Sequence, residues 1–110
     1  MLTSTLYCVV GSDCDVSFSG LIDDSGSYVD DADATAYWLA NENDITDDAL
    51  SSVTMDYVGA SNGNYLGTFN AAFTATLTAN TRNYVRFVAT SGDSTWTDVA
   101  KVIVIVGTGT

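Results

Sequence analysis

The side chains with the most evident chemistry in this sequence are carboxylates that gather in two turn-like segments. Hard cations such as Ca²⁺ bind about six to eight oxygen ligands, and clustered aspartates in loops can supply them. The spacing of an EF-hand loop is absent, however, and aspartates in turns commonly accept hydrogen bonds from nearby backbone amides. We therefore expect turn-forming carboxylates here and predict no metal site. The residues concerned are Asp23, Asp24, Asp30, Asp31, Asp33, Glu42, Asp44, Asp47 and Asp48.

Catalysis is disfavoured by the residue types that are present. The chain has no histidine, so neither a Ser-His nor a Cys-His nucleophile arrangement can form. Two carboxylates can act as acid and base in glycoside hydrolysis, but such pairs need a cleft. The carboxylates here lie in segments rich in Asp, Ser and Gly, which are typical of exposed turns. We predict no enzymatic activity, no catalytic residues and no cofactor.

The two cysteines, Cys8 and Cys14, flank a short Gly-Ser-Asp turn. A disulfide between neighbouring strands is geometrically possible at this spacing, but we expect small buried thiols. The first residues carry no positive charge and no long apolar run, so no signal peptide is visible. We accordingly expect synthesis and folding in a reducing cytosol. Two cysteines without a histidine also make a zinc site improbable.

Charge divides the sequence into an acidic first half and a balanced second half. The net charge is −11, and all three basic residues, Arg82, Arg86 and Lys101, lie in the second half. So few cations cannot neutralise a phosphate track or hold an anionic membrane, so we predict no nucleic acid and no membrane partner. We expect Arg82 and Arg86 to share one strand face. They could pair with Asp56, with Asp98, or with carboxylates of a partner.

The elements that position these residues are predicted to be strands, because apolar and polar residues alternate and Thr, Val, Tyr and Phe dominate. Asn62-Gly63 predicts a type I′ hairpin turn. The run 102–106 has no polar residue, so we expect it to be covered on both faces, or covered by a partner. A short helical turn is expected over 45–50. The expected strands are 6–10, 15–21, 34–40, 52–58, 65–69, 84–90 and 95–106.

About seven short strands in 110 residues predict one domain, an all-β, immunoglobulin-like antiparallel β-sandwich. It would span residues 1–110, with a short flexible Gly/Thr tail at 107–110. Trp38 on the third strand is expected in the core, and most other aromatic rings with it. Trp96, beside the Gly92 turn, is the best candidate for an exposed or partner-facing ring. The chain has no proline, so charge must protect the sheet edges.

Three segments of the sequence resemble small immunoglobulin-like proteins of tailed bacteriophages. The run 53–69, Val-Thr-Met-Asp-Tyr-Val-Gly-Ala-Ser-Asn-Gly-Asn-Tyr-Leu-Gly-Thr-Phe, is similar to a hairpin that recurs in them. The run 77–84, Leu-Thr-Ala-Asn-Thr-Arg-Asn-Tyr, resembles their tyrosine corner. It departs in having Asn80 in place of glycine and one extra residue before Tyr84, which puts the corner hydrogen bond in question. The run 88–96, Val-Ala-Thr-Ser-Gly-Asp-Ser-Thr-Trp, resembles their last hairpin, so the similarity covers roughly residues 14–106 in pattern.

This resemblance implies a virion accessory protein on a capsid, neck or tail, without catalytic residues. We expect a capsid decoration protein that is made in the host cytoplasm and docks on the assembled shell. Its partners would be the major capsid protein, other virion proteins, or further copies of itself. We expect the second half of the chain to meet the partner and the acidic half to face water. The alternatives are a neck or tail component, a carbohydrate-binding or adhesion module, and a calcium-stiffened spacer.

Overall fold

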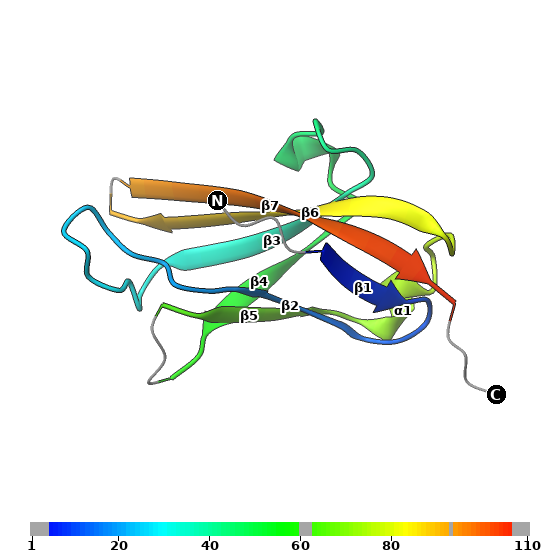
Figure 1. The fold of residues 1–110 in the computed structure, drawn as a ribbon, viewed down its shortest axis with the longest axis horizontal. Coiled ribbons are helices and arrows are strands. Elements are labelled where there is room, and N and C mark those ends of the chain that lie inside the picture. The colour runs from blue at the N-terminus through cyan, green and yellow to red at the C-terminus, as the bar shows by residue number, and fades with distance from the viewer. Residues whose placement is uncertain (1–4, 60–62, 93, 107–110) are drawn as a thin grey trace.

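The computed structural model describes residues 5–59, 63–92 and 94–106 (Figure 1). Every strand expected from the alternation is present within two or three residues of its expected bounds, and β6 begins three residues earlier. The one-turn helix α1, which Asn70 caps by accepting a hydrogen bond from the Phe73 amide at 2.9 Å, was not expected. The elements are β1 Thr5–Val9, β2 Cys14–Phe18, β3 Asp33–Leu39, η1 Thr46–Asp48, β4 Ser51–Tyr57, β5 Tyr65–Phe69, α1 Ala71–Thr74, β6 Thr81–Ser91 and β7 Ser94–Ile105.

Two features of the sequence prediction lie wholly or partly outside the described residues. They are the tail at 107–110 and Asn62 of the predicted hairpin turn. Gly63, the other half of that turn, has the positive φ of 70° that a type I′ turn requires. Within the described residues, no helix is long and apolar enough to cross a bilayer.

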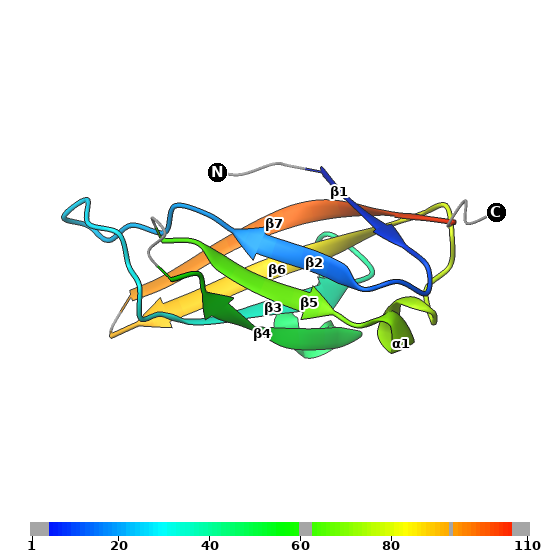
Figure 2. The same cartoon turned by 90° about the horizontal axis from the view of Figure 1, so that it is seen from below.

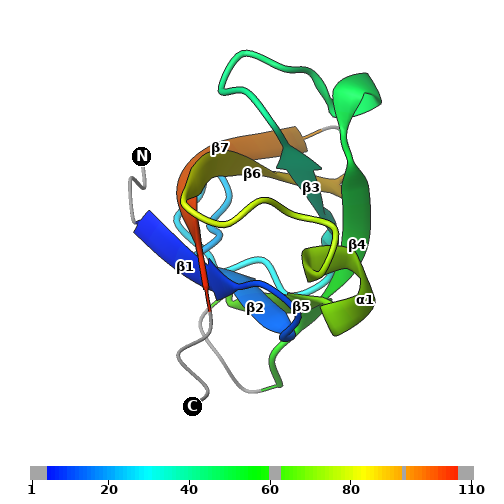
Figure 3. The same cartoon turned by 90° about the vertical axis from the view of Figure 1, so that its right-hand side faces the viewer.

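The strands form a continuous sheet in the order β1-β7-β6-β3-β4-β5-β2, which folds over into two layers (Figures 1 and 3). The upper layer holds β1, β7, β6 and β3, and the lower layer holds β5 and β2. Strand β4 passes between them, because Ser51–Met55 pair with β3 while Asp56 and Tyr57 pair with β5. The protein is thus an all-β sandwich. Strands three, six and seven share one layer and strands two and five the other, which is the grouping of immunoglobulin-type sandwiches.

Strand β1 runs parallel to β7, unlike the antiparallel pairs elsewhere in the sheet. It lies beside β7 in the view from below (Figure 2) and leads into β2 through a tight turn at Gly11, where φ is 80°. The turn brings Cys8 and Cys14 together with their Cα atoms 5.5 Å apart, and they form a disulfide. Our expectation of free thiols is therefore wrong. Both cysteine side chains are buried between the two layers, one from each layer, so their sulfur atoms lie next to each other.

The core is aromatic and centres on Trp38, which is fully buried as predicted. Its ring packs edge-on against Phe69 and Phe73, with centroids 5.1 Å and 5.4 Å away. The indole Nε1 donates a hydrogen bond to Oδ1 of Asn83 at 3.0 Å. A buried donor without a partner is costly, so Asn83 is the residue that permits a tryptophan at this position.

The segment before β6 decides the question of the Tyr84 corner hydrogen bond that the sequence left open. Asn80 adopts a positive φ of 64°, which confirms that it replaces glycine in left-handed backbone. The extra residue before Tyr84 then turns Asn83 inward and Tyr84 outward, onto the outside of the sandwich. Among the described residues the Tyr84 hydroxyl makes no hydrogen bond.

Tyr65, at the start of β5, is a buried tyrosine whose hydroxyl group holds a loop in place. Its hydroxyl donates to the Val29 carbonyl at 2.7 Å and accepts from the Ala32 amide at 3.2 Å. Burial raises the pKa of Tyr65, because its ionised form would lose contact with water. These bonds hold the long β2–β3 connection, which carries four of the acidic residues, against the end of the sandwich.

Candidate interaction face

The odd-numbered residues of β7 lie on the outside of the upper layer, because the even-numbered ones point into the core. Cross-strand neighbours share a face, so the pairing of β6 with β7 brings the basic residues together. The pairs on this side are Arg82 with Ile103, Tyr84 with Lys101, and Arg86 with Val99. This confirms that Arg82 and Arg86 share one face, and Lys101 joins them. We call this surface the outer face; its residues are Tyr7, Val9, Arg82, Tyr84, Arg86, Val99, Lys101, Ile103 and Ile105.

Two of the three cations on the outer face have no partner in the described part of the chain. Arg82 and Lys101 line a shallow depression of about 310 Å³ together with Glu42, Tyr84 and Val99. Although Glu42 borders the depression, neither cation forms an ion pair or a hydrogen bond with any described residue. Two positive groups therefore stay free for an anionic group of a partner.

Arg86 has a structural role instead. Its Nη2 donates to the Asp44 carbonyl at 3.2 Å and thereby anchors the β3–β4 connection. Its Nε is buried and has no hydrogen-bond partner among the described residues. The guanidinium is thus only partly satisfied within the protein, which is unusual for a buried donor.

The expected pairing of these cations with Asp56 or Asp98 is wrong, and strand geometry gives the reason. Asp56 lies opposite Leu66 on the outside of the lower layer, on the other side of the molecule. Asp98 is an even-numbered residue of β7 and points inward, where it is 8% exposed. Neither carboxylate can reach the outer face.

The apolar part of the outer face is covered at one side only. Leu39 of β3 lies opposite Tyr84 and faces outward, yet it is fully buried, because the β3–β4 connection with η1 folds over it (Figure 1). Towards β1, Ile103 and Ile105 stay half-exposed and Tyr7 is 67% exposed. The predicted cover on both faces of the run 102–106 is therefore not supplied by the described protein. The remaining alternative, a partner, stays a prediction.

The outside of the lower layer has a different chemistry. Its side chains are mainly polar, and some satisfy one another, as where the Thr68 hydroxyl donates to Asp15 at 2.6 Å. Asp56 and the exposed Leu66 lie on the same side. This side is acidic and the outer face is basic, so the two faces of the sandwich carry opposite charge.

Several carboxylates of the acidic turns accept hydrogen bonds from nearby backbone amides. No group of three or more Cys, Asp or Glu side chains placed to hold a metal ion exists among the described residues. Asp23 instead closes a turn, because its Oδ1 accepts from the Ser25 amide at 2.9 Å and the Ser27 amide at 3.0 Å. The Ser25 hydroxyl and these amides hold the pKa of Asp23 below its usual value. The expectation of turn-forming aspartate is confirmed at this position.

Trp96 is not an exposed ring, so that part of our expectation is wrong, whereas contact with a partner stays a prediction. It is half-buried and packs against the core from the end of β7, where it lines a groove between the two layers. Among the described residues, the rings that are mostly exposed are Tyr7 and Tyr28, at 67% and 54% exposure. No ring of the described residues stacks on Trp96.

Sequence reasoning missed the composition of the outer face, although the signal was present. Lys101, Ile103 and Ile105 share the odd phase of β7, and Arg82, Tyr84 and Arg86 share the even phase of β6. Only the register between the strands, which the sequence does not state, shows that the two sets lie side by side. No protein-family model matches the chain, and no curated protein matches it either.

Proposed function

We propose that this chain is a structural interaction protein that docks on a larger protein assembly through its outer face. The observation that carries the proposal is that all three cations share this face with half-exposed apolar side chains. Interfaces combine such apolar surface with charges that select the partner. Elsewhere the protein presents carboxylates to water.

The total charge makes the outer face the natural point of contact with an acidic surface. A protein of net charge −11 repels an acidic partner in most orientations. Approach through Arg82 and Lys101 is the orientation in which that repulsion is weakest. Ile103 and Tyr7 then supply the apolar area that stabilises the contact.

The resemblance to phage accessory proteins suggests the nature of the assembly. We infer a capsid decoration protein that binds the major capsid protein on the assembled shell. The Cys8–Cys14 disulfide suits such a location, because virions persist in oxidising surroundings outside the cell. A neck or tail component is the alternative within the same virion, and it would form rings of defined order.

The proposal is tested by co-sedimentation of the purified protein with assembled particles of the virus that encodes it. Arg82→Glu and Lys101→Glu each change the charge by two units and should each weaken binding about tenfold. Leu66→Glu/Ala72→Glu also changes the charge by two units, but on the lower layer and α1, and should bind normally. Failure of the wild type to sediment with particles would exclude decoration. Equal weakening by the control variant would exclude the outer face.

A further inference from the structure

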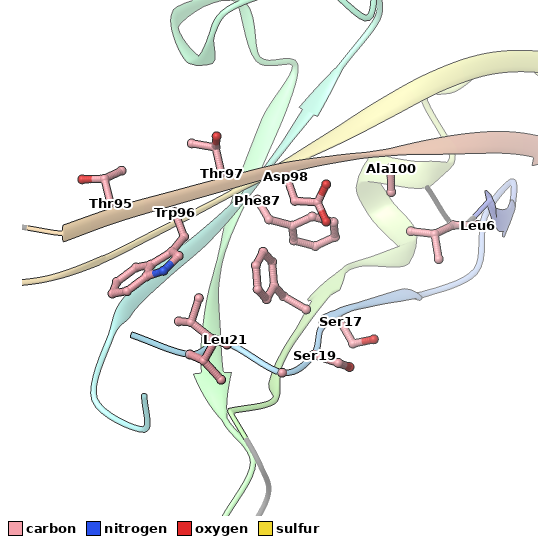
Figure 4. A pocket seen from close by; sticks show the side chains of 13 residues that line it. Leu6, Ser17, Ser19, Leu21, Phe87, Thr95, Trp96, Thr97, Asp98 and Ala100 are labelled. Atoms are coloured by element: carbon pink, nitrogen blue, oxygen red, sulfur yellow. The ribbon is translucent and has the colours of Figure 1, made fainter. Parts of the chain in front are cut away.

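A groove of about 670 Å³ opens between the edges of β7 and β2, upstream of the part of β7 that pairs with β1, and Leu6 of β1 is among its lining residues. Its walls are mostly apolar, and one carboxylate points into it (Figure 4). This groove lies inside the seam between the layers, so it is separate from the outer face. The residues that matter for the argument are Phe18, Leu21, Phe87, Trp96 and Asp98.

The edge of β7 beside this groove has backbone groups without a partner strand. Strand β1 pairs only with Lys101–Ile105, and no described residue pairs with the same edge further upstream. The Ile105 carbonyl accepts a hydrogen bond from the β1 side, at 3.0 Å, whereas the Val104 carbonyl accepts from the β6 side, at 2.7 Å. Because backbone N–H and C=O groups alternate in direction along a strand, those of the other odd-numbered residues also point towards this edge, while their side chains point to the outer face. These residues are Thr95, Thr97 and Val99.

Asp98 places a negative charge in this seam. The residue is 8% exposed, and its Oδ1 accepts a hydrogen bond from the Val99 amide at 2.8 Å. The other oxygen has no hydrogen-bond partner, and no cation pairs with the carboxylate, among the described residues. A carboxylate removed from water needs a positive partner. A strand edge with such a charge also resists pairing with purely apolar strands.

We propose that the groove binds an extended segment of a protein partner, which continues the line of β1 along the edge of β7 and carries a lysine or arginine opposite Asp98. Alternate side chains of an added strand would face into the groove, opposite Trp96, Asp98 and Ala100. The apolar walls therefore call for apolar side chains two residues before and two residues after the cation. A segment without the cation would leave the Asp98 charge buried and unpaired, which gives selectivity.

A second copy of this chain is a poor occupant, because it has no suitable strand to offer. Its three cations lie in β6 and β7. Strand β6 is paired on both sides, with β3 and β7, and Lys101 of β7 is paired with β1. The cation must therefore come from a different protein. This inference does not depend on the outer face, so either can fail without the other.

The test uses a synthetic peptide, acetyl-Thr-Val-Thr-Arg-Thr-Val-amide, which would lie along Thr95–Ala100 and leave the Thr5–Lys101 pair in place, and ¹⁵N–¹H amide shifts of the full chain. We expect saturable shifts at Thr95, Thr97 and Val99. Asp98→Asn should weaken binding about tenfold, and it should fold because its amide oxygen can still accept from Val99. A peptide with glutamate in place of arginine should not bind. Asp56→Asn removes an exposed carboxylate on the lower layer and should bind the arginine peptide normally.

Three results would overturn the proposal. The first is the absence of shifts at millimolar peptide, or equal binding of the arginine and glutamate peptides. The second is a dimer in light scattering that the peptide dissociates, because a second copy would then be the occupant. The third is binding that appears only after removal of residues 1–4, because the chain itself would then fill the edge.

Discussion

The two halves of the outer edge of β7 follow the same alternation but carry different inward side chains. Along Lys101–Ile105 the edge is covered by β1, and the inward residues are Val102 and Val104, both fully buried. Upstream, none of the described residues pairs with this edge, and the central inward residue is Asp98. An uncovered strand edge is a template for unwanted pairing, and an inward charge is one way to block it. Inward positions of β7 thus hold apolar side chains where a neighbouring strand covers the edge, and a charged side chain where none does.

The largest effect on stability is expected from removal of the disulfide that links β1 to β2. Cys8→Ser/Cys14→Ser should lower the free energy of unfolding by about 2 kcal/mol, because the short loop is no longer closed in the unfolded chain. Urea denaturation measures this change, and treatment of the wild type with a reductant is the matched control. Amide exchange at Ile103 should also speed up, which would make the covered half of the edge resemble the bare half. Unchanged exchange there would show that β1 is held by its backbone pairing alone.

A smaller effect is expected from the side chains of β1. Leu6 points inward and lines the groove, so Leu6→Ala should lower the free energy of unfolding by about 1 to 2 kcal/mol. Tyr7→Ala removes a larger side chain from the same strand, but one that is 67% exposed, and should cost less than about 0.5 kcal/mol. Both are read from urea midpoints. The reverse order would mean that the outward side of β1 contributes more than the seam.

Asp98→Val should alter association more than stability. The change makes the bare half of the edge as apolar as the covered half, and we expect the free energy of unfolding to shift by less than about 1 kcal/mol. Light scattering over a range of concentrations should show self-association that the wild type lacks. Asp56→Val adds the same side chain at a position that pairs with Leu66 of β5, away from the open edge of β7, and it should stay monomeric. A monomeric Asp98→Val protein would refute a protective role for Asp98.

The mildest test needs no substitution. The Thr97 amide points to the bare edge, whereas the Ile103 amide faces β1, so Thr97 should exchange its hydrogen about 100-fold faster. Hydrogen exchange followed by NMR compares both sites in one sample. Similar rates would mean that the bare half is covered in solution.

The strands and the core could be predicted because alternation is a local signal. Val16, Trp38 and Val85 each lie in phase with buried neighbours, and all three are fully buried. Asp98 shares the phase of Trp96 and Ala100, so its inward position was readable too. Aspartate is usually expected at the surface, and for that reason Asp98 was not predicted to be buried.

Features that depend on contacts between distant segments could not be predicted. The parallel pairing of β1 with β7 joins Thr5 to Lys101, and no local pattern states it. The same pairing places the Cys8 turn against the lower layer, which decides between thiols and a disulfide. The position of Tyr84 depends on the phase of β6. One additional residue before Tyr84 places Asn83 on the inner side of the sheet and Tyr84 on the outer side.

The two tryptophans give the molecule two separate optical reporters. Trp38 is sealed in the core and bonded to Asn83, so its fluorescence should stay blue-shifted until the sandwich unfolds as a whole. Trp96 stands at the groove wall, half in contact with water, and its emission should respond to whatever enters the seam. A shift of the Trp96 emission without a change of the Trp38 emission would then distinguish a local event at the seam from global unfolding.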